Sequence, residues 1–377
     1  MEKAKISVIQ LFAMMFLFEM GTAVVLSYGI EAKKDAWLAI LLGMGGGMVL
    51  FSVYYFLFRQ YPNLPLTGVA RKIFGKYLGW MIGLLYILLF LYIAARNVRE
   101  ISDLLVSSTM TETPLLAIAL LFVLVICYVL YLGIEVLART AEVFIVILFL
   151  FGLTGNFLVF ASANMDFHNL QPFLENGWKP IVTTTFPKII VFPFGEMIVF
   201  TMLLPYLNQS GLVKKVWLSA LISSGLVLSW TTSLNITVLG IEAVEKSTFP
   251  LLSTIGKINL LDFIQRLDVL VVFTMLITVF FKTSIYLYGA VIGMVDLFKL
   301  KNHQQILLPT GIILIFFSMM IASDFSELTE EGSVFEYYLA IPLLTIVPLL
   351  MLLITVVRNH FKKKTKDEKI KSESDAT

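Results

Sequence analysis

Apolar runs of about 20 residues or more recur along most of the chain, separated by short polar or charged stretches. A run of that length crosses the hydrocarbon core of a bilayer as an α-helix. The pattern therefore predicts an all-α membrane protein with ten spans. Their ends are defined to within ~2–4 residues. The predicted spans are about residues 6–30, 35–58, 80–107, 114–134, 138–160, 182–207, 212–240, 267–297, 305–323 and 335–357.

Lysine and arginine residues are unevenly divided between the two sets of loops. With the N-terminus inside, most of them fall on the cytoplasmic side, including Arg71, Lys72 and Lys76. Cytoplasmic loops carry an excess of these residues, so we expect both termini to be cytoplasmic. The first apolar run continues past Gly21 without a small-residue cleavage site, which indicates a retained span rather than a signal peptide.

Two connecting segments have apolar residues at spacings that indicate structure. Residues 66–80 predict an interfacial helix on the cytoplasmic face, and residues 249–264 predict a segment folded over the outer mouth, where it could act as a lid. The polar C-terminal end predicts a disordered cytoplasmic tail. The expected division is a transmembrane domain at 1–358, with repeats at about 6–160 and 182–357, followed by a tail at 359–377.

Composition agrees with a membrane protein and offers little other chemistry. Hydrophobic residues make up 58% of the chain and charged residues 14%, and the net charge of +2 gives no indication of nucleic-acid binding. The single Cys127 and three scattered histidines form no disulfide or metal-ligand pattern. The chain has no Ser/His/Asp or Cys/His constellation, so we expect neither an enzyme nor a cofactor.

The spans predicted at 6–30 and 182–207 are interrupted by residues that bilayer spanning does not require. The interruptions are Glu19-Met20-Gly21-Thr22 and Phe192-Pro193-Phe194-Gly195-Glu196. A buried carboxylate and a broken backbone are tolerated only where protein or a water-filled cavity satisfies them. Glu19 and Glu196 each lie about 20 Å along oppositely directed helices. Paired breaks of this kind predict the midplane substrate site of a five-plus-five inverted repeat.

The helix ends at these breaks predict the chemistry of a ligand. A half-helix beginning near Thr22 would direct the amides of Gly21, Thr22 and Ala23 toward an anion, and carbonyls ending near Phe192 would suit an ammonium group. Together they describe an amino-acid-sized zwitterion, although another small polar ligand could use the same ends. Phe192 and Phe194 would form apolar walls.

The two carboxylates in the breaks are not equivalent. Glu196 opens a half-helix, so it is either an N-terminal capping carboxylate or a ligand-binding group. Glu19 ends a half-helix, where both the dipole and burial disfavour a negative charge. We therefore expect Glu19 to be protonated or paired, and we regard it as the better candidate for proton coupling or for binding a ligand ammonium.

Lys282 is a third ionisable residue deep inside a span, about 15 residues from the start of the eighth. It needs a partner, and Glu19 and Glu196 are the candidates. It is either part of a structural salt bridge or an ammonium that replaces a bound sodium ion between spans 1 and 8. In the second case, the residues that would line the cation site are Thr278, Thr283 and Ser284.

Charged residues gather toward the outer end of the third span. Arg96 with Glu100 and Arg99 with Asp103 are spaced for i,i+4 pairs, so local pairing explains them. The functional alternative is that Arg96, Asn97 and Glu100 form a polar wall of an outer vestibule.

With these motifs in place, the chain resembles the endospore germination permeases, the B subunits of spore germinant receptors within the amino acid, polyamine and organocation transporter superfamily. The resemblance covers the chain to about Arg358. Its motifs are ISVIQLF and FEMGTAVV in span 1, DAWLAILLG in span 2, QPFLENGW before span 6, VFPFGEMIVF within it, and FPLLSTIGKINLLDFIQRLDVLVVF leading into span 8.

The resemblance implies a LeuT-like fold with broken helices 1 and 6 in the spore inner membrane. It also implies binding of a small nutrient germinant and action with an A subunit and a C-type lipoprotein. By the same resemblance, Gly21 to Ala23 and Phe194 to Glu196 match the unwound parts of the two broken helices. Some superfamily permeases place a lysine in span 5 at the cation site. Residues 138–160 contain none, which leaves Lys282 as a candidate substitute.

Three functions remain open from the sequence. The first is a germinant-receptor subunit that senses a ligand, and the second is a proton- or sodium-coupled amino-acid transporter that uses the same site. The third is a membrane scaffold that holds partner subunits without binding a ligand. Net flux of substrate would separate the second from the first.

Overall fold

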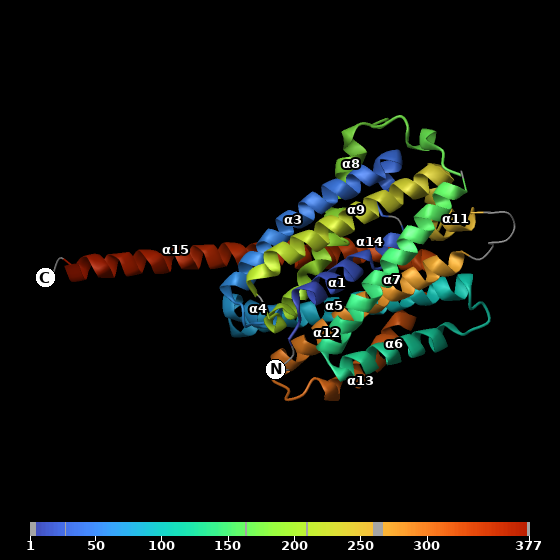
Figure 1. Cartoon of the computed structure of the whole chain (residues 1–377). Helices are drawn as coiled ribbons and strands as arrows, with labels where there is room; N and C mark the ends of the chain where they lie inside the picture. Colours follow the sequence, from blue (N-terminus) through green and yellow to red (C-terminus); the bar gives the residue numbers. More distant parts are fainter. Residues whose placement is uncertain (1–4, 27, 163, 209, 259–266, 375–377) are drawn as a thin grey trace.

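The computed structural model describes residues 5–26, 28–162, 164–208, 210–258 and 267–374 (Figure 1). About 85% of the structure is helical, and the described residues form no β-strand. The predicted all-α class is therefore confirmed.

Nine helical segments within these ranges are long and apolar enough to span a membrane. The first five are Val8–Leu26 (α1, Val8–Met20, and α2, Ala23–Leu26), Ile30–Gln60 (η1, Ile30–Asp35, and α3, Ala36–Gln60), Lys76–Ser108 (α5), Leu115–Leu132 (α6) and Ile134–Ala161 (α7). The other four are Trp178–Met202 (α8, Trp178–Thr184, η3, Thr185–Ile189, and η4, Phe194–Met202), Val213–Leu239 (α9), Asp268–Phe298 (α12) and Phe325–Phe361. The ninth predicted span corresponds to the shorter apolar helix α13, Gln304–Met320.

The two interrupted segments lie inside the bundle. In the most apolar 18-residue stretch of each segment, 78% of the residues are buried, compared with 11% in the corresponding stretch of α7. Helix α1 packs against α7, α9, α12 and η4, so protein surrounds it on several sides. Broken backbone is tolerated at membrane depth when other protein groups cover it, and this enclosure provides the cover.

Glycines on α3 allow the broken sixth segment to approach closely. A Cβ atom at Gly47 would lie 2.5 Å from Cβ of Phe194, and one at Gly43 would overlap the side chain of Ile189. Any larger residue at these positions would push the break away from α3. Small residues at helix interfaces serve this purpose in membrane proteins.

Short elements occupy the two ends of the bundle. The predicted interfacial helix is α4, Leu66–Phe74, which ends earlier than expected because Gly75 has a φ of 86° and α5 begins at Lys76. At the opposite end lie η2, Phe167–Leu170, α10, Ile241–Lys246, and α11, Pro250–Gly256. Helix α11 covers the first part of the predicted outer segment, and residues 259–266 lie outside the described residues. We call the α4 end the inner face and the α11 end the outer face.

The last span begins earlier than the sequence predicts. Helix α14, Phe325–Phe335, starts at Phe325 because the side chain of Asp324 accepts a hydrogen bond from the backbone N–H of Glu327 and caps the helix. It continues through the π-helical turns η7, Glu336–Ala340, and η8, Pro342–Ile346, into α15, Val347–Ser374.

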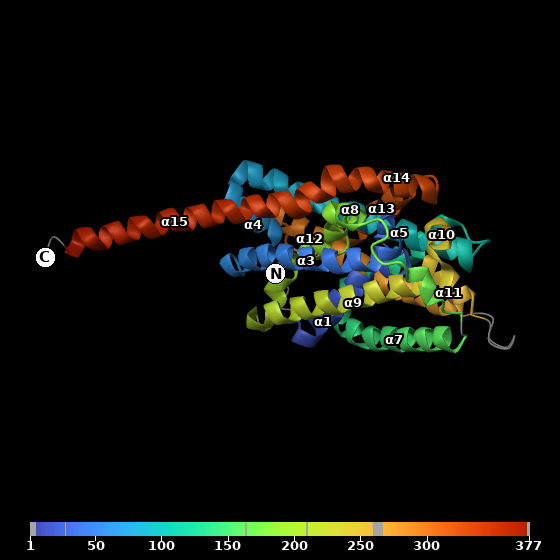
Figure 2. The ribbon, with the colours of Figure 1, turned by 90° about the horizontal axis from the view of Figure 1, so that it is seen from above.

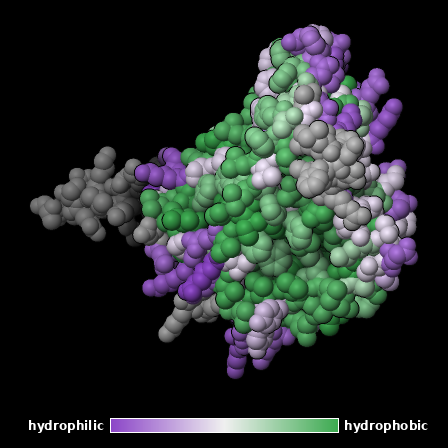
Figure 3. Space-filling view, turned by 45° about the vertical axis from the view of Figure 1, so that its right-hand side comes forward, coloured by the Kyte–Doolittle hydropathy of each residue, from purple (hydrophilic) through white to green (hydrophobic). Residues whose placement is uncertain are grey.

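Helix α15 projects beyond the bundle in both ribbon views (Figures 1 and 2). It includes the region predicted to be a disordered tail. A polar helical segment is marginally stable in water unless tertiary packing supports it, so disorder of that region stays a prediction. The surface of the bundle is largely apolar between polar rims (Figure 3), as expected for a protein that faces lipid.

Candidate functional site

The first helix break is at Gly21. Helix α1 ends at Met20, and Gly21 has φ 35° and ψ −130°. Residues with a side chain rarely adopt a positive φ. A Cβ atom at this position would also lie 2.5 Å from Cδ of Lys282. Both the backbone angle and the neighbouring lysine therefore require glycine here.

The helix that follows this break is short. Helix α2 has four residues, and the carbonyl of Thr22 accepts hydrogen bonds from the N–H groups of Val25 and Leu26. Gly21, Thr22 and Ala23 thus lie at the break as the sequence predicts. A helix of one turn has too small a dipole to form an anion site by itself.

The second helix break lies at Phe192 and Pro193. The chain leaves the helical conformation after Val191 and resumes at Phe194 in the 3₁₀ helix η4. The hydroxyl of Tyr54 on α3 lies 3.1 Å from the carbonyl oxygen of Gly195 and 2.5 Å from that of Leu344 in η8, so these two carbonyls share its one donor. A neighbouring helix therefore satisfies backbone that the break would otherwise leave exposed.

Lys282 connects the two breaks. Its Nζ lies 2.6 Å from Oε2 of Glu196, and the lysine and glutamate side chains are 0% and 5% exposed. Of the two partners that the sequence allows for Lys282, the ion pair is with Glu196. One turn earlier on α12, the hydroxyl of Thr278 donates a hydrogen bond of 2.7 Å to the carbonyl of Gly21. Helix α12 thus contacts both broken segments.

Two aromatic rings complete the surroundings of the ammonium group. Nζ of Lys282 lies 4.1 Å from the ring centroid of Phe192 and 5.3 Å from that of Phe18. A cation over an aromatic face is stabilised electrostatically, most strongly when it is desolvated. Phe18 also packs on Tyr286, with ring centroids 5.1 Å apart. One carboxylate and two rings therefore surround this cation.

Sequence reasoning did not identify Phe18 or Tyr286. The available signal was helical spacing, because Thr278, Lys282 and Tyr286 are four residues apart and share one face of α12. The predicted Thr283 and Ser284 are buried on the same helix, but neither hydroxyl has a hydrogen-bond partner in the described part of the chain. Phe194, a predicted wall, packs toward Gly47 of α3.

Glu19 is buried at the first helix break. It is 0% exposed, and neither carboxylate oxygen has a hydrogen-bond partner among the residues that the structure describes. An ionised carboxylate in such surroundings is costly unless it is paired. Of the two expectations for Glu19, a neutral protonated group fits this environment better than a paired one.

A cavity of about 470 Å³ leads from the outer face to Glu196. Residues 245–248 line it near α10, and Phe192 and Glu196 line it at the second break. Arg96, Asn97 and Glu100, the residues predicted for a vestibule, also line it. A small molecule in this cavity would meet the carboxylate that pairs with Lys282.

Arg96 and Glu100, which line this vestibule, form an ion pair, and so do Arg99 and Asp103 on the same helix. The pairs predicted within α5 both form, with Arg96 Nε 3.1 Å from Glu100 Oε1 and Arg99 Nε 3.0 Å from Asp103 Oδ2. Arg96 also reaches Glu331 of α14 at 3.4 Å. Arg96 therefore forms ion pairs and also lines the vestibule, two roles that the sequence left as alternatives.

Lys188 forms another ion pair of the vestibule. Its Nζ lies 2.9 Å from Oε1 of Glu31, which belongs to η1. Both residues line the cavity and are partly exposed. Charged groups near the outer end of a span reach water or a partner in this way.

Two broken helices packed in the centre of a helical bundle define a membrane protein with a LeuT-like fold. The fold is similar to that of Mhp1, a nucleobase-cation-symport-1 family transporter, in a closed conformation with bromovinylhydantoin bound. The TM-score is 0.70, with 14% identity, over 93% of this chain and 78% of that chain. The predicted LeuT-like class is thus confirmed.

Residues 5–326 match the sequence profile of one protein family, whose description is spore germination protein. Over 372 residues the chain is 39% identical to Spore germination protein KB of Bacillus subtilis, covering 98% of this chain and 100% of that protein. It is 26% identical to Spore germination protein YndE of Bacillus subtilis, covering 71% and 73%. The chain belongs to the spore germination permease family and is a homologue of germinant-receptor B subunits.

Proposed function

We propose that this protein is a germinant-receptor B subunit that binds a small nutrient germinant, an amino acid or a molecule of similar size, where its two helix breaks meet. The supporting observation is the cavity from the outer face to Glu196, whose carboxylate pairs with the buried Lys282. A ligand that enters from the outer face would reach this ion pair, which is already formed.

The chemistry of this pair matches a zwitterion. The ligand ammonium would bind Glu196 beside the ring of Phe192, and the ligand carboxylate would accept hydrogen bonds from Lys282. Because both buried charges exchange one partner for another, neither is left uncompensated. Arg96, Asn97 and Glu100 would guide polar ligands inward, and Glu19 would respond to protons.

Binding would then act on a conformational equilibrium. A ligand that contacts both breaks stabilises the arrangement in which they lie close together, and so shifts the population from an open toward an occluded state. In the proposed setting, an A subunit and a C-type lipoprotein read this shift in the spore inner membrane, with both termini of this chain in the cytoplasm.

The second candidate function is transport of the same ligand, coupled to protons or sodium ions. The fold similarity to a cation symporter favours it. Uptake of labelled ligand into proteoliposomes separates it from sensing, because a sensor binds the ligand without net flux.

Ligand-induced stabilisation tests the site directly. The purified protein is heated with L-amino acids, sugars, nucleosides and salts, and a ligand at 100 times its dissociation constant should stabilise it by about 2.7 kcal/mol. Glu196→Gln should lose the shift. Glu112→Gln, a change at an exposed residue outside the cavity, should keep it.

Two outcomes contradict the proposed site. One is a shift that Glu196→Gln retains in full, which would place the ligand elsewhere. The other is the absence of any shift in a preparation that also contains the A subunit and the lipoprotein, which would favour a scaffold.

A further inference from the structure

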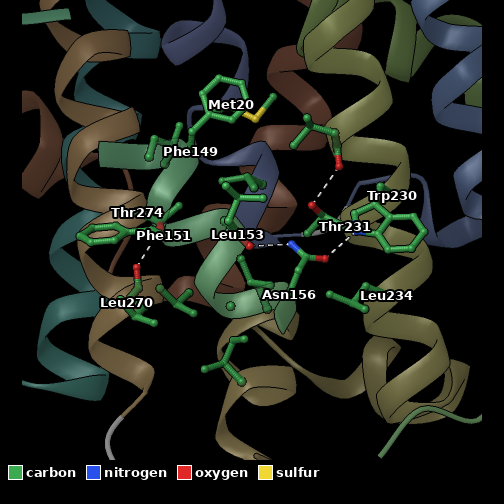
Figure 4. Close-up of a pocket in the computed structure, with 18 of the residues that line it drawn as sticks. Met20, Phe149, Phe151, Leu153, Asn156, Trp230, Thr231, Leu234, Leu270 and Thr274 are labelled. Carbon is green, nitrogen blue, oxygen red and sulfur yellow. Dashed lines mark hydrogen bonds between the residues drawn. The ribbon is translucent and has the colours of Figure 1, made fainter. Parts of the chain in front are cut away.

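A second cavity, of about 360 Å³, lies between α7, α9, α11 and α12 (Figure 4). Met20 of α1 and Val24 of α2 line it, and so do Leu153 of α7 and Trp230 of α9. It shares no lining residue with the vestibule. We refer to this cavity as the α7 groove.

The α7 groove lies at the depth of lipid hydrocarbon. Gly152 follows the charged Glu142 by ten residues, which places it about 15 Å further along the helix, half the thickness of a bilayer core. Helix α7 is the least enclosed of the spans in the described residues. Leu153 and Trp230 are exposed as well as lining the groove, so the groove opens toward lipid.

The polar side chains in the groove have partners within the protein (Figure 4). The amide nitrogen of Asn156 donates to the carbonyl of Gly152 at 2.8 Å, and Nε1 of Trp230 donates to Oδ1 of Asn156 at 2.7 Å. The hydroxyls of Thr231 and Thr274 each donate to the carbonyl four residues earlier. A polar ligand would therefore lose hydrogen bonds to water without gaining equivalent ones here. A hydrocarbon chain makes no hydrogen bonds to water, so it loses none when it enters the groove.

The groove has room for a chain but little for a helix. A Cβ atom at Gly152 would meet no heavy atom within 4 Å, and one at Gly155 would meet Cδ1 of Ile255 at an ordinary 3.7 Å. An α-helix with its side chains is about 10 Å across, so about one turn of it would fill this volume. A hydrocarbon chain is far thinner and can reach span 1 between α7 and α9.

We propose that the α7 groove is a specific site for one acyl chain of a membrane phospholipid, and that this chain ends against Met20 and Val24. These two residues stand on either side of the break at Gly21. The bound chain supports the residues on either side of the backbone break, where the side chain of Lys282 leaves no room for a Cβ atom at Gly21. This site does not depend on the identity of the germinant.

Photo-crosslinking tests this site. The protein is reconstituted in phosphatidylglycerol vesicles containing a small fraction of phosphatidylglycerol with a diazirine midway along one acyl chain. After illumination, labelled peptides are mapped by mass spectrometry. We expect labelling at Leu153 and near Trp230 that saturates and is competed by unlabelled phosphatidylglycerol.

Groove-filling variants provide the decisive comparison. Gly152→Leu should lower groove labelling several-fold, and Gly155→Val should do the same if the first variant does not fold. The matched control is Gly45→Leu on α3, where a Cβ atom also meets open space but does not line the groove. It should leave groove labelling unchanged.

Three results overturn the proposal. They are equal labelling along all exposed helices, labelling of the groove that both filling variants retain, and absence of groove labelling in the vesicles.

Discussion

Replacing Lys282 with methionine should destabilise the protein strongly. Methionine has a similar length but no charge, so the carboxylate of Glu196 would remain buried without the cation that lies 2.6 Å from it. The rings of Phe18 and Phe192 cannot replace that cation, because an aromatic face repels a negative charge.

The size of the effect follows from the burial of the pair. Breaking a buried ion pair by removing one partner costs about 3–5 kcal/mol. Loss of the cation–π contacts with Phe18 and Phe192 adds about 0.5–2 kcal/mol. Removing both charges, in Lys282→Met with Glu196→Gln, leaves no uncompensated charge and should recover much of the loss.

Unfolding of the purified protein in detergent measures these effects. A double-mutant cycle over Lys282 and Glu196 should give a coupling energy toward the upper part of the range of about 0.5–3 kcal/mol seen for contacting residues. Lys188→Met is the matched control, because its ion pair with Glu31 is partly exposed on both sides and should contribute only about 0–1 kcal/mol.

A Lys282→Met variant as stable as the control variant would contradict this prediction. Simple addition of the effects of the Lys282 and Glu196 substitutions would contradict it too, because independent effects would mean that the two groups do not pair in the folded protein.

Three further substitutions test the helix breaks, each by the change in unfolding free energy. Gly21→Ala should cost about 1–3 kcal/mol because alanine is strained at φ 35° and meets a buried side chain. Gly45→Ala, inside α3 and in open space, should be neutral or stabilise by up to about 1 kcal/mol, and an equal loss in both variants would contradict this. Tyr54→Phe should cost about 1–3 kcal/mol, since the carbonyls of Gly195 and Leu344 lose the donor that they share; a neutral result would indicate that other groups satisfy both carbonyls. Glu19→Gln should stay within about 1 kcal/mol of wild type because a neutral amide replaces a neutral acid, and a large change in either direction would show that the carboxyl is charged.

Much of the site was accessible from residue types alone. A carboxylate, a glycine and a proline inside apolar runs are costly in a bilayer, so Glu19, Gly21 and Glu196 could be singled out without coordinates. Lys282 was accessible in the same way. Its aromatic neighbours were not, because phenylalanine and tyrosine in an apolar helix are ordinary and give no signal of their own.

The helical class and the approximate ranges of the spans follow from the sequence alone. The length of an apolar run is a local property, and a run long enough to cross the bilayer forms a helix there. The sequence also located both breaks. Helix packing settles which groups meet: Lys282 pairs with Glu196, and Glu19 has no hydrogen-bond partner among the described residues. Packing also turns Phe194 toward α3 and brings the vestibule to the ion pair. These outcomes depend on how helices distant in sequence are rotated and packed against one another, and hydropathy along a single helix does not encode that rotation.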